Sequence, residues 1–248
     1  MTPDRESTDR AQSAVVGVAV LLAITVVGIG ALTAAAGAVV EEGAAAAATA
    51  RVADGVDDAL DAGTVGETET TVRLSDGTLR TADRTVRVLN GSGVVRSVSA
   101  GAVVYESGGR RVSAVAGAVT TDPIGRSGGS SMSAPPSVAA ANGTLYVGVP
   151  ALNASGTDAV SARGAALPVT LRTAPTHERR VLPADRYRVA VETTAPDAWE
   201  RGFRQRGATT SRRDFDGDGV PSVVAAFPGE RTVHLVVHDL RLRMEVGA

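Results

Sequence analysis

The sequence predicts a mainly β protein with one long N-terminal α-helix, and three observations lead to this fold class. Residues 14–40 form an uncharged stretch long enough for a helix that crosses a membrane. Beyond it, apolar residues alternate with the period of two that is typical of strands. One later segment, residues 196–207, has the apolar spacing of a short helix instead. We therefore expect three parts: a leader over residues 1–11, a membrane-spanning helix over 12–62 and an antiparallel β-rich extracellular domain over 63–248.

The uncharged stretch favours a membrane anchor. A helix rises about 1.5 Å per residue, so these residues can cross a hydrocarbon core of about 30 Å. A cleaved secretory signal would have a shorter apolar region of roughly 7–15 residues. Arg5 and Arg10 precede the stretch, whereas Glu41 and Glu42 follow it. This charge bias predicts a single-pass protein of the cell membrane, with its N-terminus in the cytoplasm and its C-terminal domain outside.

The junction between leader and apolar stretch reads Arg10-Ala11-Gln12-Ser13. It resembles the class III signal of archaeal type IV pilins and archaellins. The resemblance implies that a membrane peptidase cuts between Ala11 and Gln12, so that the apolar helix begins the mature subunit. It also implies other pilin-like subunits as partners in a surface filament. A plain signal anchor, with the leader retained, is the alternative.

Composition narrows the class of protein further. The chain contains no Cys, which excludes disulfides and thiolate metal sites. The basic residues are all Arg, and together with abundant Ala, Gly, Val and Asp this is typical of a GC-rich genome; with the signal, it resembles a haloarchaeal source. The formal net charge of −2 gives no basis for nucleic-acid binding.

The segment from Glu41 to Ala62 is expected to continue the helix outside the membrane, because Ala favours helices. Val52, Val56 and Leu60 recur every four residues on one face. This stripe fits either a pilin-like spine, packed on the globular domain or on neighbouring subunits, or a short stalk against the protein's own domain. Gly43 and Gly55 are positions where the helix could break.

Local signals predict a β-meander followed by further strands. Ser75-Asp76-Gly77 and Asn90-Gly91-Ser92-Gly93 supply the residues that tight hairpin turns require. The segment from Asp122 to Ser137 is a loop by its Gly, Ser and Pro content. The expected strands cover residues 71–74, 85–89, 94–98, 101–106, 111–116, 145–149, 167–172, 187–192, 220–227 and a final run over 232–246.

Several motifs are spread along this predicted domain: the run from Gly101 to Val119, Met132–Pro136, Asn142–Pro150, and Asp197-Ala-Trp199 with Phe203 and Gly207. Together they resemble a haloarchaeal membrane-protein family that joins a pilin-type N-terminal segment to a β-rich ectodomain. The resemblance covers roughly residues 10 to 245. It implies the fold and the cell-surface location, and it names no activity.

The sharpest chemical motif is Asp214-Phe-Asp216-Gly-Asp218-Gly219, which matches the start of a D-x-D-x-D-G calcium loop. Three alternating carboxylates can converge on a calcium ion when the chain curls around it. An EF-hand loop also needs a bidentate Glu at its twelfth position, which here is Ala225. The alternative is a hairpin turn, in which Asp and Gly serve the backbone conformation.

The three histidines do not predict a metal site. His234 and His238 would lie about 13 Å apart on a strand, too far for one ion. His177 lies far from both in sequence. The chain also lacks a nucleophile-elbow motif and a Walker loop, so we expect neither an enzyme nor a small-molecule substrate.

Each of the three Asn residues begins an N-x-[ST] sequon: Asn90, Asn142 and Asn153. Glycosylation of a translocated surface domain is one interpretation, and three ordinary turns are the other. The sequence thus predicts a pilin-like, membrane-anchored surface protein with a structural or interaction role. The alternative is a membrane-tethered binding module that depends on calcium.

Overall fold

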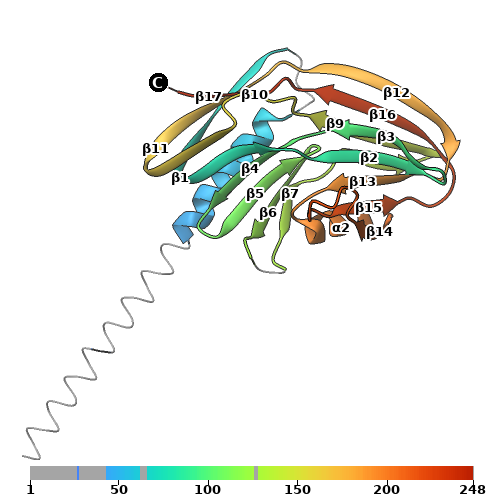
Figure 1. Ribbon diagram of the computed structural model, residues 1–248, viewed down its shortest axis with the longest axis horizontal. Helices are drawn as coiled ribbons and strands as arrows, with labels where there is room; N and C mark the ends of the chain where they lie inside the picture. The colour runs from blue at the N-terminus through green and yellow to red at the C-terminus, as the bar shows by residue number, and fades with distance from the viewer. Residues whose placement is uncertain (1–26, 28–42, 62–65, 126–127, 248) are drawn as a thin grey trace, which may run out of the picture. The chain divides into compact units, whose positions relative to one another are not determined.

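The computed structural model describes residues 27, 43–61, 66–125 and 128–247 (Figure 1). Residues 47–248 form one compact unit, which is described here by itself. The fold is mainly β, with sheets rich in antiparallel pairs, as the sequence predicts. Among the described strands only two pairings are parallel, β9 with β16 and β10 with β17.

The largest sheet has eight strands. In spatial order these are β10 (Ser155–Gly156), β17 (Arg243–Val246), β11 (Ala159–Thr173), β1 (Thr68–Ala82), β4 (Ala102–Ser107), β5 (Arg110–Val115), β6 (Ala118–Pro123) and β7 (Ser131–Ala134). Strands β4 and β5 are neighbours in sequence and in space, so the predicted meander is confirmed there, and β6 and β7 extend it. The prediction is wrong for β2 and β3, which lie in another sheet. The predicted loop after Asp122 is wrong in part, because β7 pairs with β6 inside it.

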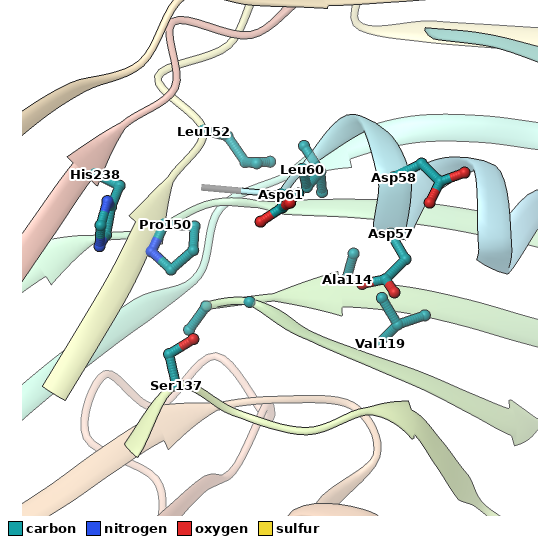
Figure 2. Close-up of a pocket in the computed structure, with 12 residues that line it drawn as sticks. Asp57, Asp58, Leu60, Asp61, Ala114, Val119, Ser137, Pro150, Leu152 and His238 are labelled. Carbon is teal, nitrogen blue, oxygen red and sulfur yellow. The ribbon is translucent and has the colours of Figure 1, made fainter. Parts of the chain in front are cut away.

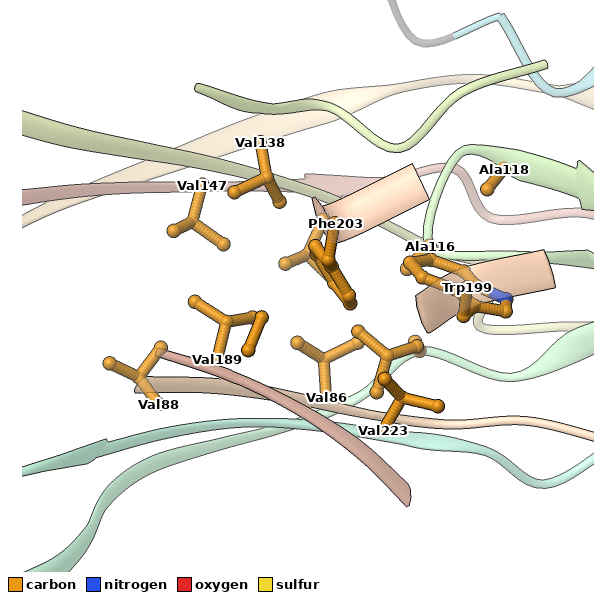
Figure 3. Packing of buried hydrophobic residues seen from close by; sticks show 14 of the residues in the cluster. Val86, Val88, Ala116, Ala118, Val138, Val147, Val189, Trp199, Phe203 and Val223 are labelled. Atoms are coloured by element: carbon orange, nitrogen blue, oxygen red, sulfur yellow. The ribbon is translucent and has the colours of Figure 1, made fainter. Parts of the chain in front are cut away.

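Two smaller sheets face each other across a second core. The five-stranded sheet has the order β14 (Thr209–Arg213), β15 (Ser222–Ala226), β13 (Arg188–Glu192), β2 (Thr85–Asn90) and β3 (Gly93–Ser99). The four-stranded sheet has the order β12 (Thr176–Asp185), β16 (Arg231–Asp239), β9 (Thr144–Ala151) and β8 (Val138–Ala141). Val86 and Val189 of the first sheet and Val147 of the second belong to one buried cluster (Figure 3).

The predicted short helix is confirmed as α2 (Pro196–Arg204). Pro196 begins it, where a missing N–H costs no hydrogen bond. Trp199 and Phe203 lie one turn apart with ring centroids 5.4 Å from each other, and both are fully buried in the core between the two smaller sheets (Figure 3). The helical spacing of these two aromatic residues therefore places both on the face of α2 that is buried.

A helix runs without a break over residues 43–59. Its apolar stripe is buried as expected: Val52 and Val56 are each 1% exposed and pack with residues of the eight-stranded sheet. Gly55 does not break the helix; a side chain there would meet Val72 of β1 at 3.1 Å. The glycine thus permits close packing of helix on sheet.

Two predicted turns had different outcomes. The Asn90–Gly93 turn joins β2 and β3 as expected. The hairpin at Ser75–Gly77 is wrong, because β1 continues through it with a bulge after Leu74. The Tyr105 hydroxyl donates a hydrogen bond to the Asp76 carbonyl, and a side chain at Gly77 would collide with the Glu106 carbonyl. The glycine therefore serves strand packing instead of a hairpin.

The final alternating run over residues 232–246 is not one strand. It divides into β16 in the four-stranded sheet and β17 in the eight-stranded sheet. Arg241 adopts a positive φ of 49° between them, and the buried Leu240 and Leu242 flank it. The chain crosses between sheets here while keeping its apolar residues inside.

Candidate functional site

The Asp214–Gly219 loop connects β14 to β15, which pair antiparallel. The interpretation of this motif as a hairpin turn is therefore confirmed. Gly217 and Gly219 adopt φ values of 74° and 83°, a region that glycine occupies without strain.

Two of the three aspartates of this loop, Asp214 and Asp218, accept hydrogen bonds from the backbone of the loop. Asp214 accepts hydrogen bonds from the backbone N–H groups of Asp216, Gly217 and Gly219 at 3.2, 2.8 and 3.2 Å. These bonds favour the charged form and lower the pKa of Asp214. Asp218 accepts from the N–H of Val220 at 2.8 Å. Both side chains act as turn caps.

Asp216 points to a different partner. Its two carboxylate oxygens accept hydrogen bonds of 2.9 and 2.7 Å from one nitrogen of Arg87 on β2. The other terminal nitrogen of Arg87 lies 3.7 Å from Glu192 on β13, which is only 4% exposed. Burial raises the pKa of Glu192, against the opposing effect of Arg84. The loop is thus anchored by a partly buried ion network.

The Asp214, Asp216 and Asp218 side chains therefore do not converge. Within the described ranges no group of three or more His, Asp or Glu side chains is arranged to hold a metal ion. The geometry assigns these three residues a structural role in closing the β14–β15 connection over the five-stranded sheet.

The three sequons lie at the surface but differ in their surroundings. Asn142 is exposed in the β8–β9 turn, with a φ of 50° and Gly143 behind it. The amide nitrogen of Asn90 donates to Asp185 at 2.9 Å. That of Asn153 donates to Asp239 at 3.3 Å. The side-chain amide to which a glycan would be attached is thus hydrogen-bonded to a carboxylate at Asn90 and at Asn153.

The histidines form an arrangement that the sequence did not reveal. His234 and His238 lie on β16 as separate side chains, as expected. The antiparallel register of β12 and β16, however, places His177 directly opposite His238. Their Nδ1 atoms are 2.8 Å apart and their rings meet edge-on, at 79°. A pairing between residues 61 apart in sequence has no local signal.

His238 borders a cleft of about 440 Å³ (Figure 2). The end of the 43–59 helix lies on the far side, and the acidic residues of that side are Asp57, Asp58 and Asp61. Burial raises the pKa of Asp57, and its acidic neighbours raise it further. On the other wall, burial lowers the pKa of His238, with smaller contributions from His177 and Arg179.

His177 borders a second cleft of about 800 Å³. Its lining also contains carboxylates, namely those of Asp83, Asp158, Glu178 and Asp239. Among the described residues, no arginine lines either of these two clefts. The histidine pair therefore lies between two surfaces of negative character.

The predicted N-terminal features fall largely outside the described residues. This holds for the processing site at Ala11 and Gln12 and, apart from Val27, for the predicted span over residues 14–40. Within the described part of the chain, no helix has both the length and the apolar character needed to cross a membrane.

Fold and site together define a β-rich domain with a helix docked on its largest sheet and an anchored acidic loop. The chain belongs to a family of unknown function, DUF7289, whose model matches residues 10–243. No curated protein and no solved structure matches it.

Proposed function

We propose that this protein is a pilin-like, membrane-anchored surface protein with a structural or interaction role. Its apolar stretch, residues 14–40, would hold it in the membrane, with the β-rich domain outside the cell. The observation that carries the proposal is the stripe of the 43–59 helix. Val52 and Val56, which follow the apolar stretch in sequence, are buried against the domain's own sheet. The class III signal implies an apolar N-terminal segment joined to such a packed domain.

The packing of the 43–59 helix bears on whether its apolar stripe contacts the protein's own domain or neighbouring subunits. Since Val52, Val56 and Leu60 already pack on their own domain, they are not available to neighbouring subunits. Assembly into a filament would therefore depend on the apolar stretch. Gly30 and Ala34 are four residues apart in sequence, a spacing that in a helix would allow close helix–helix approach.

The test is the N-terminus of the protein extracted from its native membranes. Pilin-type processing predicts an intact mass and an N-terminal sequence that begin at Gln12. The variant Gln12→Ala keeps the span unchanged and serves to probe the cleavage site. A mature chain that begins at residue 1 or 2 would contradict pilin-type processing and leave a plain anchor.

A second measurement addresses assembly. Replacing Gly30 and Ala34 by Leu should preserve membrane fractionation, because the helix stays apolar, and should reduce oligomers or filaments. Replacing Leu21 and Leu22 by Ile is the matched control, since it changes shape without adding bulk at the small-residue face. Oligomers that survive the Gly30/Ala34 double substitution would show that this face is not the packing surface.

A further inference from the structure

We propose that His177 and His238 form a two-ligand binding site for a divalent transition-metal ion, of which Cu²⁺ is the best fit. The site is independent of membrane anchoring and assembly. It rests on the cross-strand register of β12 and β16, which holds the two Nδ1 atoms 2.8 Å apart. Imidazole nitrogen is a ligand that Cu²⁺, Ni²⁺ and Zn²⁺ all accept.

The nitrogen separation lets both imidazoles reach one ion. Two Nδ1 atoms 2.8 Å apart, each about 2.0–2.1 Å from a metal ion, would subtend an angle of roughly 90° at it. Neighbouring ligands in the square-planar and tetragonal coordination of Cu²⁺ and Ni²⁺ are separated by that angle. Among divalent first-row ions Cu²⁺ binds such ligands most tightly, which makes it the ion to test.

The tautomeric states of the two rings allow metal binding to replace the hydrogen bond between them. In the hydrogen bond between the rings, one Nδ1 carries the proton and the other accepts it. Metal binding needs both Nδ1 lone pairs, so the donating ring moves its proton to Nε2 through solvent. Both rings remain neutral, and a rotation of each ring turns its lone pair from its partner toward the ion.

The surroundings favour a cation. Asp57, Asp58 and Asp61 line the cleft on the side of His238, and Glu178 and Asp239 line the cleft on the side of His177. Arg179, two residues from His177 on β12, is a nearby positive charge that opposes this effect. With only two histidines in reach and no third ligand assembled in the described ranges, water would complete the coordination.

His234 shows what sets the pair apart. It lies on the same strand and also projects from the four-stranded sheet, but its cross-strand neighbours are Val181 and Tyr146. Its ring lies 5.3 Å from that of Tyr146. It therefore offers one nitrogen and no chelate, which makes it the matched control.

The test is a Cu²⁺ titration of the full chain in detergent, prepared without a polyhistidine tag, by calorimetry. We expect one saturable Cu²⁺ per chain. His177→Ala should weaken it at least tenfold, and His238→Ala should do the same, because either substitution destroys the chelate. His234→Ala should leave the affinity within twofold. His177 is exposed on an edge strand, so its substitution keeps the fold even if that of His238 does not.

Electron paramagnetic resonance gives a second readout. Nitrogen splitting from two imidazoles in the wild type should change to that of one in His177→Ala. Cu²⁺ should also raise the melting temperature of the wild type and of His234→Ala, but not of His177→Ala, since a ligand of the folded state stabilises it. Absence of saturable binding, or equal binding by all variants, as at the N-terminal amine, would overturn the proposal.

Discussion

Arg87 and Asp216 lie 129 residues apart in sequence and are joined by two hydrogen bonds of 2.9 and 2.7 Å. The pair ties the β14–β15 loop to strand β2, which lies between β13 and β3 in the five-stranded sheet. Phe215 lies between two guanidinium groups, those of Arg87 and Arg213, at 4.9 and 4.7 Å. The acidic motif is thus held by arginine on the sheet it covers.

Removal of Arg87 should therefore destabilise the domain strongly. Arg87 is 8% exposed and also faces the buried Glu192. Arg87→Met should lower the free energy of unfolding by about 3–5 kcal/mol, because it leaves a buried carboxylate with a single cation. Asp216→Asn should cost about 1 kcal/mol, since that side chain is 43% exposed.

Urea unfolding of both variants and of the double variant measures the coupling. Asp218→Asn is the control, because Asp218 accepts a hydrogen bond from the Val220 N–H within its own turn. Additive effects of the two substitutions would contradict a direct Arg87–Asp216 interaction.

The helix stripe should contribute to the stability of the domain. Val56 is 1% exposed against the eight-stranded sheet. Val56→Ala should lower the free energy of unfolding by about 1–3 kcal/mol, through lost burial and a residual cavity. Asp54→Ala, at an exposed position of the same helix, should change it little. Equal effects of the two substitutions would mean that the helix is not docked in solution.

Asp122 should make stability depend on pH. It is 8% exposed, and its Oδ1 has no hydrogen-bond partner among the described atoms. Burial raises its pKa from 3.8 to about 6, against the opposing effect of Arg111. The folded state thus holds the proton more tightly than the unfolded state does. The stabilisation from this group is complete below about pH 4 and is lost as the pH rises through about 6.

Asp122→Asn should therefore stabilise the protein more at pH 8 than at pH 4, by on the order of 1–3 kcal/mol. The lowered pKa of His238 has the opposite effect, because it decreases the free energy of unfolding as the pH falls. This effect is common to variant and wild type, so the difference in their free energies of unfolding at each pH isolates the contribution of Asp122. Asp54→Asn at an exposed position serves as control. A difference independent of pH would show that Asp122 is not buried as a carboxylate.

Glycosylation, if the domain is translocated, should favour Asn142. Its side chain is exposed in a tight turn, whereas the amides of Asn90 and Asn153 are bonded to Asp185 and Asp239. Glycopeptide mass spectrometry of the protein from its native membranes should show the highest occupancy at Asn142. Thr144→Ser should keep that glycan and Thr144→Val should remove it. Higher occupancy at Asn90 would contradict this order.

Much of the fold follows from the sequence alone. The stripe of the 43–59 helix shows its period directly, because one face of the helix is buried, whereas β2 and β13 appear as short apolar segments because consecutive residues of both are buried. Pro196, Trp199 and Phe203 predict helix α2 in the same local way. The Asn90–Gly93 turn and the β14–β15 turn also follow, because Gly and Asn there meet a backbone requirement within four to six residues.

Other features were decided only by tertiary structure. Strand β12 is exposed along nearly its whole length, so its sequence shows no alternation of apolar and polar residues that would predict a strand. It forms because it pairs with β16. The same edge pairing creates the contact between His177 and His238, and the strand order of the five-stranded sheet brings Arg87 to Asp216. Gly77 resembles a turn residue, but it lies inside β1, paired with Ala162, where β4 approaches it too closely for a side chain. The local sequence determines which face of a strand or helix is apolar. Which strands pair with one another depends on contacts between residues far apart in sequence, and no short segment of the sequence specifies such contacts.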